Sequence, residues 1–94
     1  MAHGYRNFET RALLRRLDKV RPTALRERLV ERMSSYVYPQ LREQPFYGPN
    51  IRKLRGVVPI TWRYRLGRWR LFYAVDEKSR ILSVLTITPR KDAY

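Results

Sequence analysis

The feature that most constrains this chain is an alternation of basic and apolar residues on both sides of one glycine, Gly67. The stretch covers residues 62–73 and reads Trp-Arg-Tyr-Arg-Leu-Gly-Arg-Trp-Arg-Leu-Phe-Tyr. Alternation with a period of two predicts a strand. A two-residue turn at Gly67-Arg68 suits glycine, because type I′ and II′ turns need a positive φ. The stretch therefore predicts a β-hairpin.

The position of the turn sets the register of this hairpin. Counting outward from the turn gives the pairs Leu66 with Trp69, Arg65 with Arg70, Tyr64 with Leu71, Arg63 with Phe72, and Trp62 with Tyr73. Because side chains alternate between faces, the aromatic and aliphatic residues share one surface, which we expect to be core. Arg63, Arg65, Arg70 and Phe72 share the other. Like charges directly opposite destabilise a sheet unless something negative lies over them, so this second face predicts an anion site.

Charge extends this expectation to the whole chain. The sequence has 21 Lys and Arg against 8 Asp and Glu, a formal net charge of +13, and 17 of the 21 cations are arginines. The guanidinium fork suits bidentate contact with phosphate. We expect nucleic acid as the first partner and an acidic protein as the second. No segment forms a basic amphipathic anchor, so a membrane is not expected. The alternative is a basic surface that is merely solvated.

Length and composition limit the remaining classes. A chain of 94 residues with 44% hydrophobic residues suffices for one domain, covering residues 1–94. The absence of cysteine excludes disulfides and thiolate chemistry, and one histidine with eight scattered carboxylates predicts no metal site and no cofactor. We assign no catalytic role to His3. Without a long apolar run or a signal peptide, the chain is predicted to be cytoplasmic.

The pattern before residue 62 predicts a helical layer. Residues 2–8 are a weak candidate for a first strand. Thr10 is a candidate N-cap for a helix, and a second amphipathic helix is expected after Pro22, ending near Tyr36 or Tyr38. The apolar positions of these helices are Leu13, Leu14, Leu17, Val20, Leu25, Leu29, Met33 and Val37. The prolines and glycine of residues 38–50 predict an irregular connection.

Three strands are predicted after this connection, over residues 57–66, 69–75 and 81–88, with a polar turn at residues 76–79. The predicted fold is α+β, an N-terminal helical hairpin packed on a small antiparallel-rich β-sheet. Antiparallel pairing of the last two strands brings Arg90 and Tyr94 near Gly67. We predict that the turn between these strands has an odd number of residues, or that one strand has a bulge. Either would place the Arg90 side chain on the same face as Arg70.

The order of these elements resembles a known family. The set comprises Lys-Leu-Arg-Gly at residues 53–56, the alternating basic strand, Gly-x-x-Arg with an apolar pair and Tyr at residues 67–73, an apolar strand, and Arg90-x-x-x-Tyr94. Together they resemble the RelE branch of the RelE/ParE toxin superfamily, with element order β-α-α-β-β-β. The resemblance implies a type II toxin that cleaves mRNA in the ribosomal A site without a metal, by attack of the ribose 2′-OH on the phosphate. It also implies three partners: a cognate antitoxin, the ribosome and mRNA.

The resemblance also implies residue roles. Arg70 matches the arginine at the scissile phosphate, Arg90 the arginine near the leaving group, and Tyr94 the tyrosine that orients the nucleotide. The catalytic set is Arg65, Arg70, Arg90 and Tyr94. The set expected to bind RNA or the ribosome is Arg52, Lys53, Arg55, Arg63 and Phe72.

Two features of this sequence depart from the family. Arg63 and Arg65 stand where the family usually has two lysines, and arginine is a poor proton acceptor. The general base is therefore open between Tyr94, a ribosomal or RNA group, and electrostatic activation alone. Pro89 replaces a histidine often found before the arginine. The alternative functions are a ParE-like inhibitor of DNA gyrase without nuclease activity, and a plain RNA-binding module.

Overall fold

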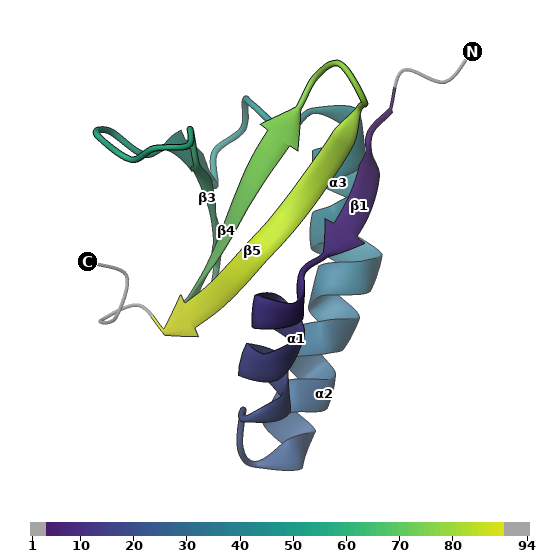
Figure 1. The fold of residues 1–94 in the computed structure, drawn as a ribbon. Helices are drawn as coiled ribbons and strands as arrows, with labels where there is room; N and C mark the ends of the chain where they lie inside the picture. Colours follow the sequence, from purple (N-terminus) through teal and green to yellow (C-terminus); the bar gives the residue numbers. More distant parts are fainter. Residues whose placement is uncertain (1–3, 90–94) are drawn as a thin grey trace.

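The computed structural model describes residues 4–89 and has a five-stranded sheet with helices packed against one face (Figure 1). The strands are β1 (Arg6–Glu9), β2 (Ile51–Lys53), β3 (Trp62–Leu66), β4 (Trp69–Asp76) and β5 (Ile81–Pro89). Their order across the sheet is β1-β5-β4-β3-β2, with β1 parallel to β5 and the other neighbours antiparallel. The predicted α+β fold is confirmed.

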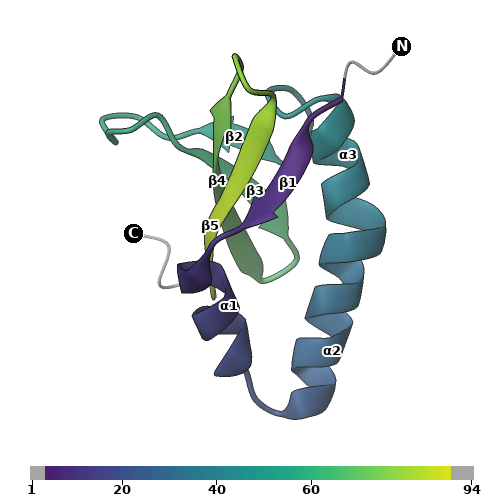
Figure 2. The same cartoon turned by 45° about the vertical axis from the view of Figure 1, so that its right-hand side comes forward.

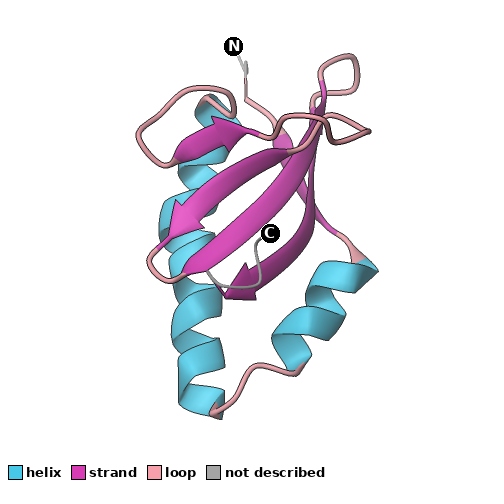
Figure 3. Ribbon diagram, turned by 90° about the vertical axis from the view of Figure 1, so that its left-hand side faces the viewer, coloured by secondary structure: helices cyan, strands magenta, loops and turns pink. Residues whose placement is uncertain are grey.

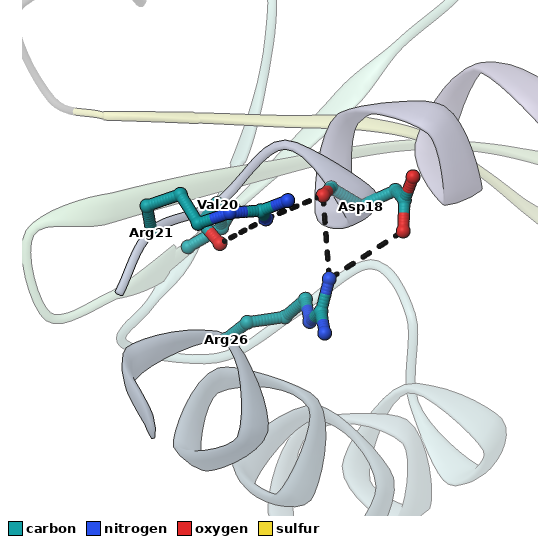
Figure 4. Close-up of polar contacts among 4 residues, drawn as sticks. All are labelled: Asp18, Val20, Arg21 and Arg26. Atoms are coloured by element: carbon teal, nitrogen blue, oxygen red, sulfur yellow. Dashed lines mark hydrogen bonds and ion pairs between the residues drawn. The ribbon is translucent and has the colours of Figure 1, made fainter. Parts of the chain in front are cut away.

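The helical layer begins with α1 (Arg11–Asp18), which Thr10 caps as predicted. Its Oγ1 accepts a hydrogen bond from Leu13 N at 3.2 Å and donates to Val84 O at 2.9 Å, so one side chain both starts the helix and ties it to β5. At the other end, Arg26 Nη1 contacts Asp18 O at 3.3 Å and Asp18 Oδ1 at 3.4 Å (Figure 4). Arg21 Nη1 donates to the same carbonyl at 2.7 Å. These contacts satisfy a carbonyl that the end of α1 leaves free.

The second helix is longer than predicted. It runs from α2 (Thr23–Arg32) through a π-helical turn η1 (Met33–Val37) into α3 (Tyr38–Glu43), so the predicted end near Tyr36 or Tyr38 is wrong. Pro39 explains the π turn: it has no N–H to donate, and its ring would clash with the carbonyl four residues earlier. The Tyr38 N–H bonds instead to Met33 O, five residues back. This wider turn lets the helix pass the proline without ending.

The hairpin has the predicted register, from Leu66 paired with Trp69 to Trp62 paired with Tyr73. Gly67 has φ +59°, the conformation for which glycine was predicted. Tyr64, Leu71 and Tyr73 are fully buried beneath the helices, which confirms that this face of the hairpin is core. The Tyr73 hydroxyl donates to Pro45 O at 2.6 Å, so the core also holds the chain that leaves α3.

The predicted irregularity between the last two strands is a bulge. Phe72 pairs with Thr86 but Tyr73 pairs with Val84, so Leu85 is an extra residue in β5. This shift places Thr86 and Thr88 on the arginine face of the sheet. Arg90, whose position was the reason for the prediction, lies outside the described residues.

Two predicted strand boundaries are wrong, and one strand was not predicted. The strand predicted over residues 57–66 begins at Trp62, because a loop containing Pro59 occupies residues 54–61. The strand β2 was not predicted, since three residues are too few to show an alternation. The first strand covers Arg6–Glu9 instead of residues 2–8.

Candidate nucleic-acid interface

The face of the sheet that turns away from the helices carries the predicted arginines. Figure 2 shows the long α2–α3 helix along one side of the strands, and Figure 3 looks onto the other side of the sheet, with this helix behind. We call this side the open face and define it by side chains that strand alternation places there. They are Arg52, Arg63, Arg65, Arg70, Phe72, Thr86 and Thr88.

The register arranges these residues in two rows across the sheet. Arg52, Arg63, Phe72 and Thr86 form the first row, one from each of β2, β3, β4 and β5. Arg65, Arg70 and Thr88 form the second row, closer to the Gly67 turn. Arginines at neighbouring positions in both rows repel each other, so the open face attracts anions.

Arg70 is the most restrained cation of the open face. It is only 8% exposed, and its Nη1 donates to Gly67 O at 3.1 Å and to Trp69 O at 3.0 Å. The turn therefore fixes the direction of this guanidinium, whereas Arg65 opposite is exposed. A cation held in place by the backbone loses little side-chain entropy when it binds an anion.

Two buried polar atoms lie on the same face. Arg63 Nε and Thr88 Oγ1 have no hydrogen-bond partner within residues 4–89. Buried polar atoms in folded proteins are nearly always paired, so such exceptions tend to mark functional sites. Both atoms can donate a hydrogen bond, and phosphate oxygens are acceptors.

A carboxylate at the far end of β4 does not offset this charge. Asp76 Oδ1 accepts from Lys78 N at 3.0 Å and from Ser79 N at 3.4 Å, within the turn before β5. These hydrogen bonds, that of Ser79 foremost, lower the pKa of Asp76. Asp76 therefore closes the turn, at the opposite end of β4 from Arg70.

A comparison with protein-family models matches residues 10–94 to the ParE toxin of type II toxin-antitoxin system, parDE. The chain belongs to the ParE toxin family. No curated protein sequence matches it.

Solved structures of similar fold relate this ParE-family chain to RelE toxins, within the RelE/ParE superfamily. The toxin–antitoxin complex RelBE2 from Mycobacterium tuberculosis matches with 24% identity and a TM-score of 0.71, over 93% of this chain and 99% of that one. The archaeal RelE–RelB complex from Pyrococcus horikoshii matches with 26% identity and a TM-score of 0.61, over 99% and 100%. The intact RelBE complex from E. coli matches with 23% identity and a TM-score of 0.63, over 90% and 95%.

Not every predicted site residue of this ParE-family toxin reaches the open face. Lys53 pairs with Trp62 and therefore lies on the opposite side of β2 from Arg52, beside Phe46 and Tyr47. Arg55 is exposed in the loop between β2 and β3. Arg90 and Tyr94 lie outside the described residues, so their predicted catalytic roles stay predictions.

Sequence reasoning missed a pocket beside the Gly67 turn. It has a volume of about 400 Å³ and joins residues from the second helix to the end of the hairpin. Its lining includes Arg32, Tyr36, Asn50 and Arg68, none of which was predicted to be functional. The available signal was Tyr36, an aromatic residue outside the four-residue spacing of the helix's apolar stripe.

The described part of the chain lacks two other features. Between residues 4 and 89, no three His, Cys, Asp or Glu side chains group closely enough to hold a metal ion. In the same range, no helix has the length and apolar character needed to cross a membrane.

Proposed function

We propose that this toxin is a ribosome-dependent endoribonuclease that cleaves mRNA in the ribosomal A site. The observation that carries the proposal is the pairing of a fixed guanidinium, Arg70, with the exposed Arg65 on a face that also holds Phe72 and two buried donors. Such a face offers phosphate contacts together with an aromatic ring for base stacking. The RelE structures of the same fold support this proposal over a generic basic surface.

The proposed reaction is a transesterification. The ribose 2′-oxygen attacks the adjacent phosphorus, the bond from phosphorus to the 5′-oxygen breaks, a base takes the 2′-OH proton, and an acid supplies a proton to the leaving 5′-oxygen. The phosphorane between these steps carries extra negative charge. Arg70 and Arg65 would stabilise that charge, and a guanidinium fixed beforehand needs no rearrangement to do so.

The proton transfers need groups other than these arginines. Arginine stays protonated at any pH near neutrality and cannot act as the base. On the described open face, the side chains named above are arginine, phenylalanine and threonine, so none has a pKa suited to this task. We therefore assign Arg90 to the leaving group and Tyr94 to the nucleotide, with activation of the 2′-OH by Tyr94, by a ribosomal or RNA group, or by the positive charge alone.

The proposed partners follow from the charge and from the solved complexes. A cognate antitoxin is proposed because the structures of similar fold are toxin–antitoxin complexes. An apolar groove of about 840 Å³ between α2 and the end of the hairpin, lined by Leu25, Leu29, Leu66 and Trp69 among others, suits the apolar side of an antitoxin segment. Acidic residues on that segment would complement the net charge of +13. The ribosome and mRNA are the proposed targets in the cytoplasm.

The test is Arg70→Ala in a primer-extension assay on translated mRNA. We expect A-site cleavage to fall at least about a hundredfold, as for the loss of one preorganised donor to a transition-state charge. Arg15→Ala, at an exposed position of α1, is the matched control and should cleave normally. Because Arg70 also bonds to the turn, the unfolding midpoint of each variant must be compared with that of the wild type. Normal cleavage by a folded Arg70→Ala variant would remove the assignment.

A second candidate is inhibition of DNA gyrase. The family model supports it, because its description is of the ParE branch. A supercoiling assay with purified gyrase separates the two candidates. Inhibition by the wild type, unaffected by Arg70→Ala and without mRNA cleavage, would favour the gyrase inhibitor.

A further inference from the structure

The pocket beside the Gly67 turn is assembled from three separate parts of the chain: the second helix, the residue before β2, and the hairpin. Arg32 ends α2, Tyr36 lies in the π turn, Asn50 precedes β2, and the hairpin supplies Tyr64–Arg68 and Arg70. Its volume of about 400 Å³ lies in the range of roughly 300–1,000 Å³ that small-molecule sites occupy. The backbone fixes the Asn50 side, since Arg65 N donates to Asn50 O at 2.9 Å.

The pocket is electropositive. Among its lining residues in the described chain are four arginines and no carboxylate. Arg70 is engaged with the carbonyls of the turn, but Arg32 from α2 and Arg65 and Arg68 from the hairpin are exposed. Three cations that converge from the helix and the hairpin form a binding position for an anion such as a phosphate.

Aromatic surface accompanies the charge. The Tyr36 side chain is 48% exposed although it is large and apolar, and the Arg32 guanidinium carbon lies 5.1 Å from the centre of its ring. Phenol rings and guanidinium planes are both surfaces on which RNA bases stack. The π turn that Pro39 imposes leaves Tyr36 outside while Met33 and Val37 are buried on either side.

The floor of the pocket is neutral and hydrogen-bonded. The Tyr64 hydroxyl donates to Gln40 Oε1 at 3.1 Å. Burial raises the pKa of Tyr64, so the hydroxyl keeps its proton at neutral pH. The floor therefore adds hydrogen-bonding groups but no negative charge.

We propose that this pocket binds one nucleotide of single-stranded RNA, with its base against Tyr36 and Arg32 and its phosphate on Arg65 and Arg68. Arg65 and Arg70 belong to both the open face and the pocket, so an RNA strand that lies on the open face reaches the pocket at the Gly67 end of the hairpin. The nucleotide is therefore a neighbour of the one whose phosphate lies at Arg70. RNA as the ligand rests on the proposed function. An acidic peptide would use the arginines but would leave the stacking surface without a role.

The experiment measures binding without cleavage. The full chain is titrated with a fluorescent single-stranded RNA hexanucleotide carrying 2′-O-methyl groups, which cannot undergo the 2′-OH reaction. Tyr36→Ala should weaken binding by about tenfold, the loss of one stacked base, while Tyr36→Phe keeps the wild-type affinity. Tyr47→Ala, which removes an exposed tyrosine elsewhere, should also bind normally. Equal affinity of Tyr36→Ala and the wild type would overturn the proposal.

A second measurement is the salt dependence of RNA affinity, which reports the phosphate contacts made by arginines. Arg68→Gln should flatten the dependence of log affinity on log salt by about 0.7, the value for one phosphate contact with a single strand. Arg15→Gln, an exposed α1 residue, should leave this slope unchanged. A glutamate-rich peptide that displaces the RNA, and whose affinity falls with Arg32→Gln but not with Tyr36→Ala, would assign the pocket to an acidic protein and overturn the RNA assignment.

The outcome separates this inference from the proposed function. If the wild type fails to cleave mRNA on ribosomes yet Tyr36→Ala loses affinity for the hexanucleotide, the endoribonuclease proposal fails and the RNA pocket stands. If the wild type cleaves and Tyr36→Ala alters neither affinity nor cleavage, the pocket proposal fails alone.

Discussion

The two faces of the β3–β4 hairpin come from the same twelve residues but have opposite requirements. On the helix side, Tyr64, Leu71 and Tyr73 are fully buried and close the core. On the open side, Arg63 and Arg65 stand opposite Phe72 and Arg70, with no helix over them. Alternation lets neighbouring residues serve these different purposes, so stability and anion binding can be altered separately.

The largest difference is expected between alanine substitutions of two adjacent residues that lie on opposite faces of the hairpin. Leu71→Ala should lower the free energy of unfolding by about 2–5 kcal/mol, because it leaves a cavity in the core. Phe72 is half-buried on the open face. Phe72→Ala should therefore lower the free energy of unfolding by less than Leu71→Ala and should weaken RNA binding. Urea unfolding and a filter-binding assay measure the two quantities. Similar stability losses with equal RNA binding would show that the faces are not independent.

Of the two faces of the hairpin, alkaline pH should act on the helix face. Burial raises the pKa of Tyr64, and burial together with the charge of Tyr64 raises that of Tyr73. Their neutral forms stabilise the fold fully below about pH 10, the ordinary pKa of tyrosine. As pH rises further, the unfolded state loses its protons first, so stability falls by up to about 1.4 kcal/mol per pH unit for each residue.

Urea unfolding between pH 8 and 11 measures this slope. Tyr73→Phe should flatten it by the contribution of one group, although the variant also loses the hydrogen bond to Pro45 O. An identical slope in Tyr73→Phe and the wild type would contradict the assignment to this hydroxyl.

The smallest effect on stability is expected on the open face. Arg63→Met removes a charge opposite Arg52 and a buried Nε that has no partner within residues 4–89. The free energy of unfolding should change by no more than about 0.5 kcal/mol. The salt dependence of RNA binding should nevertheless flatten by about 0.7, as for one lost phosphate contact. A large loss of stability with unchanged RNA binding would assign Arg63 to the fold.

Local chemistry explains which parts of the structure were predictable from sequence. The hairpin register followed from one glycine and an alternation of period two, and Thr10 was recognisable as a cap because its hydroxyl acts within three residues. The same alternation identified Arg63, Arg65 and Arg70 as neighbours on one face. A bulge or an odd turn was expected because it changes which face the later side chains of the last strand occupy, and the structure contains a bulge at Leu85.

The missed features depend on interactions between distant residues. Pro39 indicated the end of a helix, but the π turn and the buried Met33 and Val37 carry the helix past it. The strand β2 exists because it pairs with β3, and its three residues show no pattern of their own. The pocket of Arg32, Tyr36 and Asn50 forms only when the second helix lies beside the hairpin end, so no single segment could reveal it.

The parallel pairing of β1 with β5 has a consequence for the order of events during synthesis. Phe8 pairs with Ser83, so the strand made early acquires its only sheet neighbour in the described structure after about seventy further residues have been translated. Pairings this distant in sequence form slowly, because a long loop must close first. Until β5 is made, β4 lacks one of its two neighbours and the open face lacks Thr86 and Thr88. A partly synthesised chain therefore has neither a closed core nor a complete open face.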